Sequence, residues 1–370
     1  MKRTALIFSL FFLLTAAAAQ VDFYGSARVG LWYVNLDEDY TGGEQRTEMH
    51  YDLYSNSRLG ANWKNYNFKA NVEFGFKNGT ACLRKLYGEY DFGKFSLLVG
   101  QTYTGFGDIA CQATSIHSGL DDCLIGYGAF YDGRHPMIKF SFKNGPYLML
   151  MEPSKIAPAG YSEYVDALVP KINIGYELKI DNVNLHPTFG FNISQYNEDI
   201  AWWEAANPDF DPADSTSTPT IMVNSDELIS AYAAALTITY AEEKIKFVGQ
   251  INYGQNIADY GMATSVAGNA GWDEIKQEVI NIETFGGYGQ ISYLYSEKME
   301  FTGGAGYFSA KLDGIDDNDE AISAFVQLKY TLNEYVKVVP EIGIFDDLED
   351  LAGNVQGSRI YAGTKLQIDF

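Results

Sequence analysis

Basic residues are scarce in this chain of 370 residues, because 26 lysines and arginines are set against 48 acidic residues, for a formal net charge of −22. A nucleic-acid-binding protein needs a basic footprint, so this composition excludes nucleic acid as a partner. Histidine is rare as well, with four residues, and the sequence contains no nucleophile motif. We therefore expect no enzymatic activity.

Long apolar runs are absent after the first residues of the chain. Lys2 and Arg3 precede an uncharged, apolar stretch over 4–19 that ends in four alanines. This order predicts a cleaved signal peptide over 1–19. Its removal takes away two basic residues and no acid, so the single domain 20–370 has a net charge of −24. No later stretch reaches the roughly 18 apolar residues of a membrane helix, so a membrane-embedded domain would have to be a closed β-barrel.

Apolar and polar residues alternate with a period of two over most of the mature chain. In the last twelve residues, the uncharged set comprises Ile360, Ala362, Thr364, Leu366, Ile368 and Phe370. The same alternation runs through 21–34, 49–64, 68–77, 170–180, 185–194, 245–253, 322–330 and 336–344. A strand with this pattern has one face in an apolar medium and the other in a polar one. The abundance of tyrosine and phenylalanine, 27 and 23 residues, is typical of a barrel with aromatic girdles.

Short and long connections between these segments alternate along the chain. Short turns are predicted at 65–67, 93–94, 143–146, 181–184, 241–244, 297–299 and 332–335. Longer polar segments fall at 35–48, 78–82, 104–124, 153–168, 197–226, 257–278, 313–320 and 346–358. This order predicts an all-β fold, a transmembrane antiparallel up-and-down β-barrel of about 16 strands with a water-filled lumen. The alternative is a secreted soluble β-protein, whose polar faces would meet bulk water.

Four stretches carry a resemblance to a known family. The last strand, which ends on Phe370, resembles the closing strand of outer-membrane β-barrels. Residues 23–33, 57–60 and 86–107 resemble parts of the trimeric general diffusion porins of the Gram-negative outer membrane. The resemblance implies a homotrimer in contact with outer-membrane lipid and lipopolysaccharide, and passive diffusion of ions and small hydrophilic solutes. It also implies a third extracellular loop, here 104–124, that folds into the barrel and narrows the pore.

The resemblance further implies acids on this loop that face basic residues on the barrel wall. The candidate pore-constriction residues are Asp108, Asp121, Asp122, Arg58, Arg28, Lys85 and Arg134. Arg58 matches the family's Arg-Leu-Gly, the other three basic residues are chosen by strand parity or proximity, and Gln101 stands where the family commonly has arginine. The family's Pro-Glu-Phe-Gly-Gly-Asp-like segment is absent. Opposed charges across a narrow channel create a transverse field, and the net charge of −24 leads us to expect a mild cation preference.

The three cysteines of the chain would reach an oxidising compartment after secretion. We predict a disulfide between Cys111 and Cys123, which would make the third loop more rigid. Cys82 is an alternative partner for either of them, and one thiol is left over in any pairing.

Two further loops carry functional signals of lower specificity. The closely spaced carboxylates of Asp313, Asp316, Asp317 and Asp319 are a candidate Ca²⁺ site, but the full Ca²⁺-loop spacing is missing and a solvated surface loop is the preferred interpretation. No other cofactor is expected. Trp202 and Trp203 lie in the longest loop, 197–226, where they are interpreted as interface anchors or loop packing, with a carbohydrate-stacking platform as the alternative.

Two other functions compete with passive diffusion. A substrate-specific channel for sugars or dicarboxylates would show saturable conductance that a solute can block. A structural envelope protein would form the same barrel without significant conductance.

Overall fold

The computed structural model describes residues 20–54, 56–77, 80–107, 124–156, 165–196, 228–261, 270–273, 278–315 and 317–370. The predicted signal peptide over 1–19 lies outside these residues, so its cleavage stays a prediction. Within the described parts of the chain, no helix is both long and apolar enough to cross a membrane.

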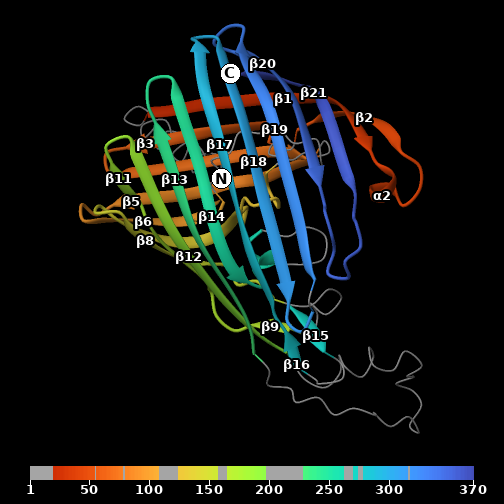
Figure 1. Cartoon of the computed structure of the whole chain (residues 1–370). Helices are drawn as coiled ribbons and strands as arrows, with labels where there is room; N and C mark the ends of the chain where they lie inside the picture. The colour runs from red at the N-terminus through yellow and green to blue at the C-terminus, as the bar shows by residue number, and fades with distance from the viewer. Residues whose placement is uncertain are drawn as a thin grey trace, which may run out of the picture.

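Strands account for nearly all of the regular structure (Figure 1). In chain order they are β1 (Gln20–Leu36), β2 (Arg46–Leu53), β3 (Arg58–Asn65), β4 (Phe68–Lys77), β5 (Thr80–Asp91), β6 (Phe95–Tyr103), β7 (Arg134–Phe142), β8 (Pro146–Met151), β9 (Val165–Ala167), β10 (Lys171–Tyr176), β11 (Leu178–Ile180), β12 (Val183–Tyr196), β13 (Leu228–Ala241), β14 (Ile245–Gln255), β15 (Gly271–Asp273), β16 (Glu278–Ile280), β17 (Ile282–Ser296), β18 (Met299–Leu312), β19 (Asn318–Thr331), β20 (Val336–Asp346) and β21 (Ser358–Asp369). Two short helical turns, α2 (Glu38–Thr41) and η2 (Ile257–Tyr260), lie in the connections.

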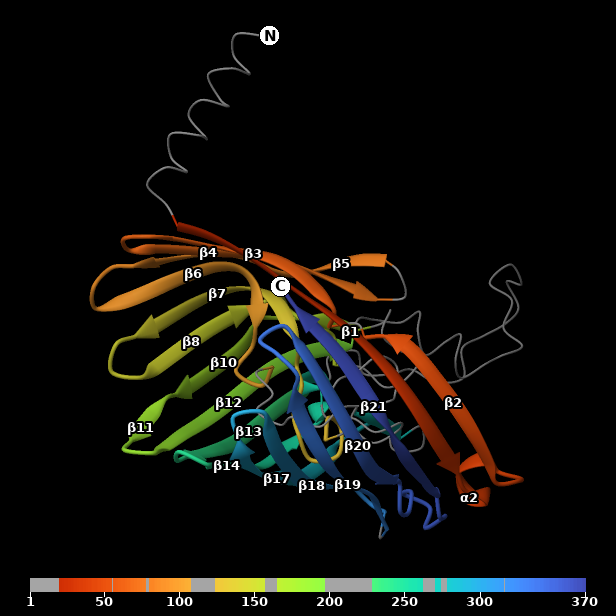
Figure 2. The ribbon, with the colours of Figure 1, turned by 90° about the horizontal axis from the view of Figure 1, so that it is seen from above.

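The main sheet closes on itself because β1 pairs with strands from both ends of the chain (Figure 2). Its antiparallel register with β21 runs from Ser26↔Asp369 to Leu36↔Arg359, and it also pairs with β2 and β3. The sheet contains 19 strands, while β15 and β16 form a separate hairpin. Since β2 and β3 are two parts of one crossing, and β9, β10 and β11 are three parts of another, the 19 strands make 16 crossings. The predicted antiparallel barrel of about 16 strands is confirmed.

Asp37, which directly follows β1, links the first and the last strand of the barrel by hydrogen bonds at the seam where these two strands pair. Its Oδ2 accepts hydrogen bonds from the backbone nitrogen of Ser358 at 2.6 Å and from the Ser358 hydroxyl at 2.7 Å. Its Oδ1 accepts a hydrogen bond from the backbone nitrogen of Tyr40 at 2.8 Å. Although partial burial acts to raise it, these hydrogen bonds hold the pKa of Asp37 below its usual value. The ionised carboxylate therefore stabilises the closed seam.

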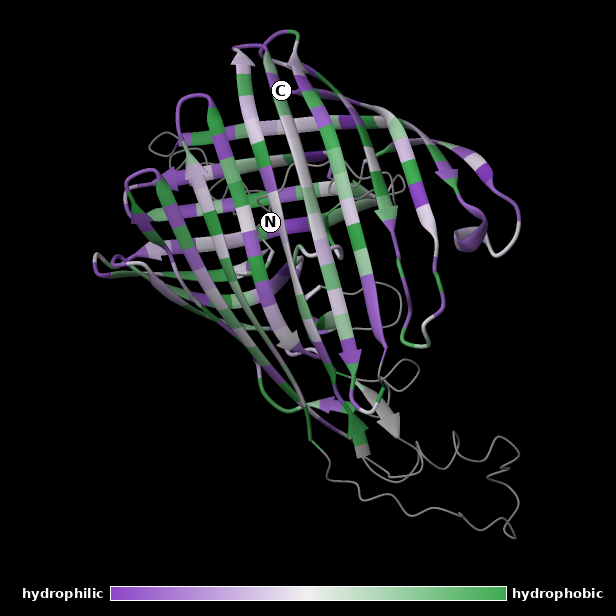
Figure 3. Cartoon of the chain, viewed as in Figure 1, coloured by the Kyte–Doolittle hydropathy of each residue, from purple (hydrophilic) through white to green (hydrophobic). Residues whose placement is uncertain are grey.

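Hydrophobic and hydrophilic residues alternate along the strands of the barrel (Figure 3). Val326 on β19 and Ile342 on β20 are 58% and 56% exposed on the outside. Their neighbours Gln327 and Glu341 point inward and are only 5% and 4% exposed. An apolar outside and a polar inside suit a barrel that stands in an apolar medium around an aqueous interior, which is the arrangement that the alternation predicts.

All seven predicted short turns are confirmed, and they lie at one end of the barrel (Figure 1). In two of them a residue other than glycine adopts the left-handed region, Tyr66 with φ of 45° and Asp181 with φ of 50°. Tight turns at one end and long connections at the other are typical of an up-and-down barrel.

Several predicted loop boundaries are wrong. Strands β1 and β2 run into the predicted loop 35–48, and β5 begins at Thr80, inside the predicted loop 78–82. The third long connection runs to Gly133 instead of residue 124. In the first two loops, strand pairing continues past the apolar part of the hairpin, so polarity alone ends the strands too early.

The predicted continuous strand over 49–64 is interrupted between β2 and β3. Tyr54 turns into the barrel there and is 2% exposed. Its hydroxyl accepts a 2.6 Å hydrogen bond from Trp32 Nε1, which is also buried. The residues on both sides keep their predicted faces, because the interruption spans an even number of residues.

Candidate functional site

Glu73 on β4 is the centre of a charged cluster on the inner wall of the barrel. Its side chain is 1% exposed and accepts hydrogen bonds from Arg84 Nε at 2.7 Å and from the Tyr24 hydroxyl at 2.8 Å. Lys85 Nζ and Arg58 Nη1 lie 3.7 Å and 3.8 Å from its Oε2. One carboxylate thus stands among three cations.

A β-bulge places Arg84 in this cluster. Glu73 is opposite Lys85, but the next pair is Phe74 with Leu83, so Arg84 is an extra residue in β5. A bulge changes the direction of the side chain that it inserts, and here both Arg84 and Lys85 approach the carboxylate of Glu73. Strict alternation predicts that one of two adjacent residues points outward. The sequence therefore indicates that Lys85 lines the interior, but it does not indicate that Arg84 also does so or that both side chains meet at Glu73.

The other two predicted basic residues lie at the edges of the same cluster. Arg134 Nη1 donates to the Tyr103 hydroxyl at 2.9 Å, and the same oxygen accepts from Arg84 Nη2 at 3.1 Å. Arg28 Nε donates to the Ser26 hydroxyl at 2.9 Å. The structure therefore brings Arg58 and Lys85 together directly, and connects Arg134 to them through Tyr103.

Residues 124–133, which we call the inner segment, lie against the inner face of the barrel. Asn252 Nδ2 on β14 donates to the carbonyl oxygen of Gly128 at 2.7 Å. A Cβ at Gly128 would come within 2.1 Å of the carbonyl oxygen of Gly287 on β17, and one at Gly306 on β18 within 2.0 Å of the carbonyl oxygen of Tyr127. Backbone packs directly on backbone here, so the inner segment occupies part of the barrel cross-section.

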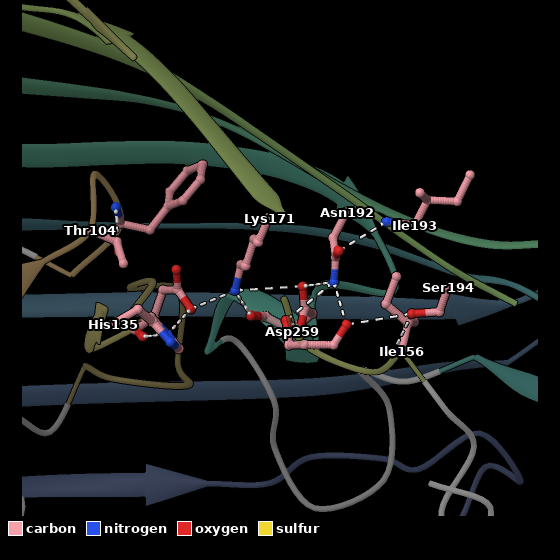
Figure 4. A network of polar contacts seen from close by, with 11 residues as sticks. Thr104, His135, Ile156, Lys171, Asn192, Ile193, Ser194 and Asp259 are labelled. Atoms are coloured by element: carbon pink, nitrogen blue, oxygen red, sulfur yellow. Dashed lines mark hydrogen bonds and ion pairs between the residues drawn. The ribbon is translucent and has the colours of Figure 1, made fainter. Parts of the chain in front are cut away.

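The first attachment of the inner segment is a buried charge network around Lys171 on β10 (Figure 4). Lys171 is 0% exposed, and its Nζ lies 2.7 Å from Asp132 Oδ1 in the inner segment and 3.5 Å from Asp259 Oδ2 in η2. Asn192 Nδ2 donates to Asp259 Oδ2 at 3.0 Å, and His135 Nε2 contacts Asp132. One ammonium group therefore joins two long connections to the wall.

The second attachment is at the other end of the inner segment, where Tyr127 meets β20 and β21. The Tyr127 hydroxyl donates to Asp347 Oδ1 at 2.6 Å, and Arg359 contacts both this hydroxyl and Asp347 Oδ2, the latter at 3.0 Å. The Arg359 guanidinium also lies 4.6 Å from the ring centre of Tyr40 and 5.0 Å from that of Phe345. The inner segment is thus attached to the barrel wall at both ends.

Several predicted site residues lie outside the described residues. They are Asp108, Asp121, Asp122, Cys111, Cys123, Asp316, Trp202 and Trp203. Their roles stay predictions, and so does the inward course of residues 108–123. Cys82, the third cysteine, is exposed and unbridged within the described residues.

The described members of the candidate Ca²⁺ site do not converge. Asp313 and Asp317 are exposed on the loop, whereas Asp319 turns inward at the start of β19 and is 9% exposed. Among the residues that the structure describes, no group of three or more side chains has a metal-binding arrangement.

This chain is similar to known proteins in its fold and not in its sequence. No protein-family model matches the sequence, and no curated protein matches it. The outer membrane channel DcaP of Acinetobacter baumannii has a similar structure, with a TM-score of 0.70 at 14% identity over 96% of this chain and 98% of that one. OmpF of Salmonella typhi gives 0.61 at 11% identity over 95% and 98%, and an anion-selective porin from Comamonas acidovorans gives 0.58 at 11% over 95% and 100%. The chain has the porin fold.

Proposed function

We propose that this chain is a porin of the Gram-negative outer membrane, through which ions and small hydrophilic solutes diffuse passively. The observation that carries the proposal is the closed barrel of 16 crossings with an apolar outer face and a charged, polar inner face. A barrel of this size leaves an aqueous channel, whereas an eight-stranded one is filled by its side chains. No reaction is part of the proposed function.

The inner segment supplies the narrowing that such a channel needs to select solutes by size. It is attached to the wall at both ends. We propose that residues 104–124 complete the constriction, with Asp108, Asp121 and Asp122 facing the basic wall and a Cys111–Cys123 disulfide within the loop.

The working form would be a homotrimer of residues 20–370, surrounded by outer-membrane lipid and lipopolysaccharide after removal of residues 1–19. One structure with a similar fold, OmpT of Vibrio cholerae, is described in a trimer form, with a TM-score of 0.60 at 14% identity. The outward apolar side chains of this chain would be covered by lipid or by the other two copies.

Conductance of the purified protein in a planar lipid bilayer tests the proposed function. Stepwise insertions are expected, each with a current that rises in proportion to bulk salt conductivity, and liposomes containing the protein should swell in small sugars and not in large ones. A current that saturates with one solute would instead support a substrate-specific channel. A folded protein that inserts without conductance would support the structural alternative.

A further inference from the structure

A groove of about 740 Å³ lies on the outer face of the barrel, over the middle of β13. Its lining comes from β8, β10, β12, β13, β14 and β17, which pair in this order in the wall. The exposed side chains around it, which define what we call the outer groove, are Ile174, Tyr176, Phe189, Ile251, Tyr253 and Phe285. Its volume is within the range of sites that hold small molecules.

The outer groove exists because one small residue stands in a row of large ones. Cross-strand neighbours run from Ile174 through Phe189, Ala234 and Tyr253 to Phe285. Neighbours of this kind are about 5 Å apart, so the rings of Phe189 and Tyr253 flank the methyl group of Ala234. Ala234 is the seventh of the fourteen residues of β13, which places the floor of the outer groove near the middle of the wall.

An acyl chain of the membrane can fill the outer groove, whereas a second barrel cannot. The outer face of a barrel is convex, so a neighbouring copy would rest on the rim and leave the floor empty (Figure 2). An unfilled hollow forfeits the dispersion contacts of its lining. A single acyl chain is thin and flexible, and at this depth of the outer membrane hydrocarbon surrounds the wall.

A carboxylate lies beside the outer groove, on the side of the long connections. Glu283 is exposed on the same face of β17 as Phe285 and lies two residues closer to the start of the strand. The Tyr253 hydroxyl donates a hydrogen bond to it. An ionised carboxylate has about four acceptor positions, so Glu283 can accept further hydrogen bonds from a ligand. The long connections are on the extracellular side in barrels of this kind, so Glu283 lies towards the head groups of the outer leaflet.

We propose that the outer groove is a binding site for one membrane lipid, with an acyl chain over Ala234 and a head-group donor on Glu283. The site rests on the membrane location in the proposed function and not on permeation. Bulk lipid is as apolar as the outer groove, so transfer of the acyl chain adds little affinity by itself. The head-group hydrogen bond therefore supplies most of the selectivity, and the acyl chain supplies the position.

Native mass spectrometry of the protein in mild detergent tests the site by counting the lipids that each chain retains. Phosphatidylethanolamine is the probe, because its ammonium group donates hydrogen bonds. Phosphatidylcholine with the same acyl chains is the control, because its head group has the same net charge and no donor. We expect one phosphatidylethanolamine per chain, and about tenfold weaker retention of phosphatidylcholine, which lacks the charge-assisted hydrogen bond.

Substitutions separate the two parts of the site. Ala234→Phe fills the floor of the outer groove and should abolish the retention of both lipids. Glu283→Gln should weaken the retention of phosphatidylethanolamine about tenfold and leave that of phosphatidylcholine unchanged. Ala305→Phe is the matched control, because Ala305 is exposed, is the seventh of the fourteen residues of β18 and does not line the outer groove.

The outcomes distinguish this proposal from the proposed function. Equal retention by the Ala234→Phe and Ala305→Phe proteins, or equal retention of the two lipids by the unmodified protein, would overturn the site. A smaller number of chains per complex in Ala234→Phe alone would also overturn it, because a second copy would then cover the outer groove. Absence of conductance in the unmodified protein would count against permeation and leave the lipid site standing.

Discussion

Replacement of Lys171 by methionine is expected to release the inner segment while the barrel stays closed. Methionine keeps most of the side-chain volume and removes the charge, which leaves Asp132 and Asp259 buried at 3% and 6% exposure without their common partner. Removing one member of a buried ion pair typically costs about 3–5 kcal/mol. The cost falls on the contact between the inner segment and η2, because the strand ladders of the wall do not depend on this lysine.

Limited proteolysis with chymotrypsin and single-channel recording would measure this release. The Lys171→Met protein should be cleaved near Phe130 much faster than the unmodified protein and should show larger current fluctuations. The matched control also changes Asp132 and Asp259 to asparagine, which removes both orphaned charges and should restore part of the resistance. Unchanged cleavage and unchanged current noise in Lys171→Met would refute the assignment of this network as an attachment.

Other substitutions test the packing, the seam and the loop. Gly306→Ala should displace the inner segment and change single-channel conductance, whereas Gly303→Ala on the same strand should not, because a Cβ there meets nothing closer than 3.6 Å. Asp37→Asn should lower the melting temperature at neutral pH, and the difference should disappear in acid. The pKa of Asp37 is lower in the folded barrel than in the unfolded chain, where it is about 3.9. The ionised carboxylate therefore stabilises the fold at pH values above about 3.9, and this stabilisation is lost as the pH falls through the pKa of the folded state. Peptide mapping without reduction should recover Cys111 joined to Cys123, and a peptide joining either to Cys82 would contradict the predicted pairing.

The alternation of the sequence predicts the barrel well because each strand meets a different medium on its two faces. The inward direction of Arg58, Lys85 and Lys171 follows from counting residues along one strand, and so does the outward direction of Val326 and Ile342. The short turns could also be predicted from the sequence, because a short polar break between two alternating segments is typical of a tight turn between paired strands.

The candidate site was harder to predict from the sequence, because its geometry depends on residues that are distant in the chain. The bulge at Arg84 breaks the parity on which the prediction of wall residues rests. The buried charge network joins Asp132 of the inner segment, Lys171 of β10 and Asp259 of η2. Nothing in the spacing of these residues along the chain indicates that they meet. The sequence ended the third loop at residue 124, although the apolar residues that follow belong to the same connection and pack inside the barrel.

The net charge of the chain does not describe the charges on one part of its inner wall. The chain carries an excess of acids, yet Arg58, Arg84 and Lys85 all lie within 4 Å of the carboxylate of Glu73. Acids on outer loops are screened by salt, whereas charges on a narrow lumen act on every solute that passes.

The central claim is that lipid covers the outer face of this barrel and water fills it. Two neighbouring positions on β21 test it most directly, in a protein whose three cysteines are replaced by serine. In lipid vesicles, a water-soluble thiol reagent that does not cross membranes should label Lys365→Cys, which faces inward, and should not label Leu366→Cys, whose natural side chain is 51% exposed on the outside. Labelling of Leu366→Cys with protection of Lys365→Cys would contradict the account.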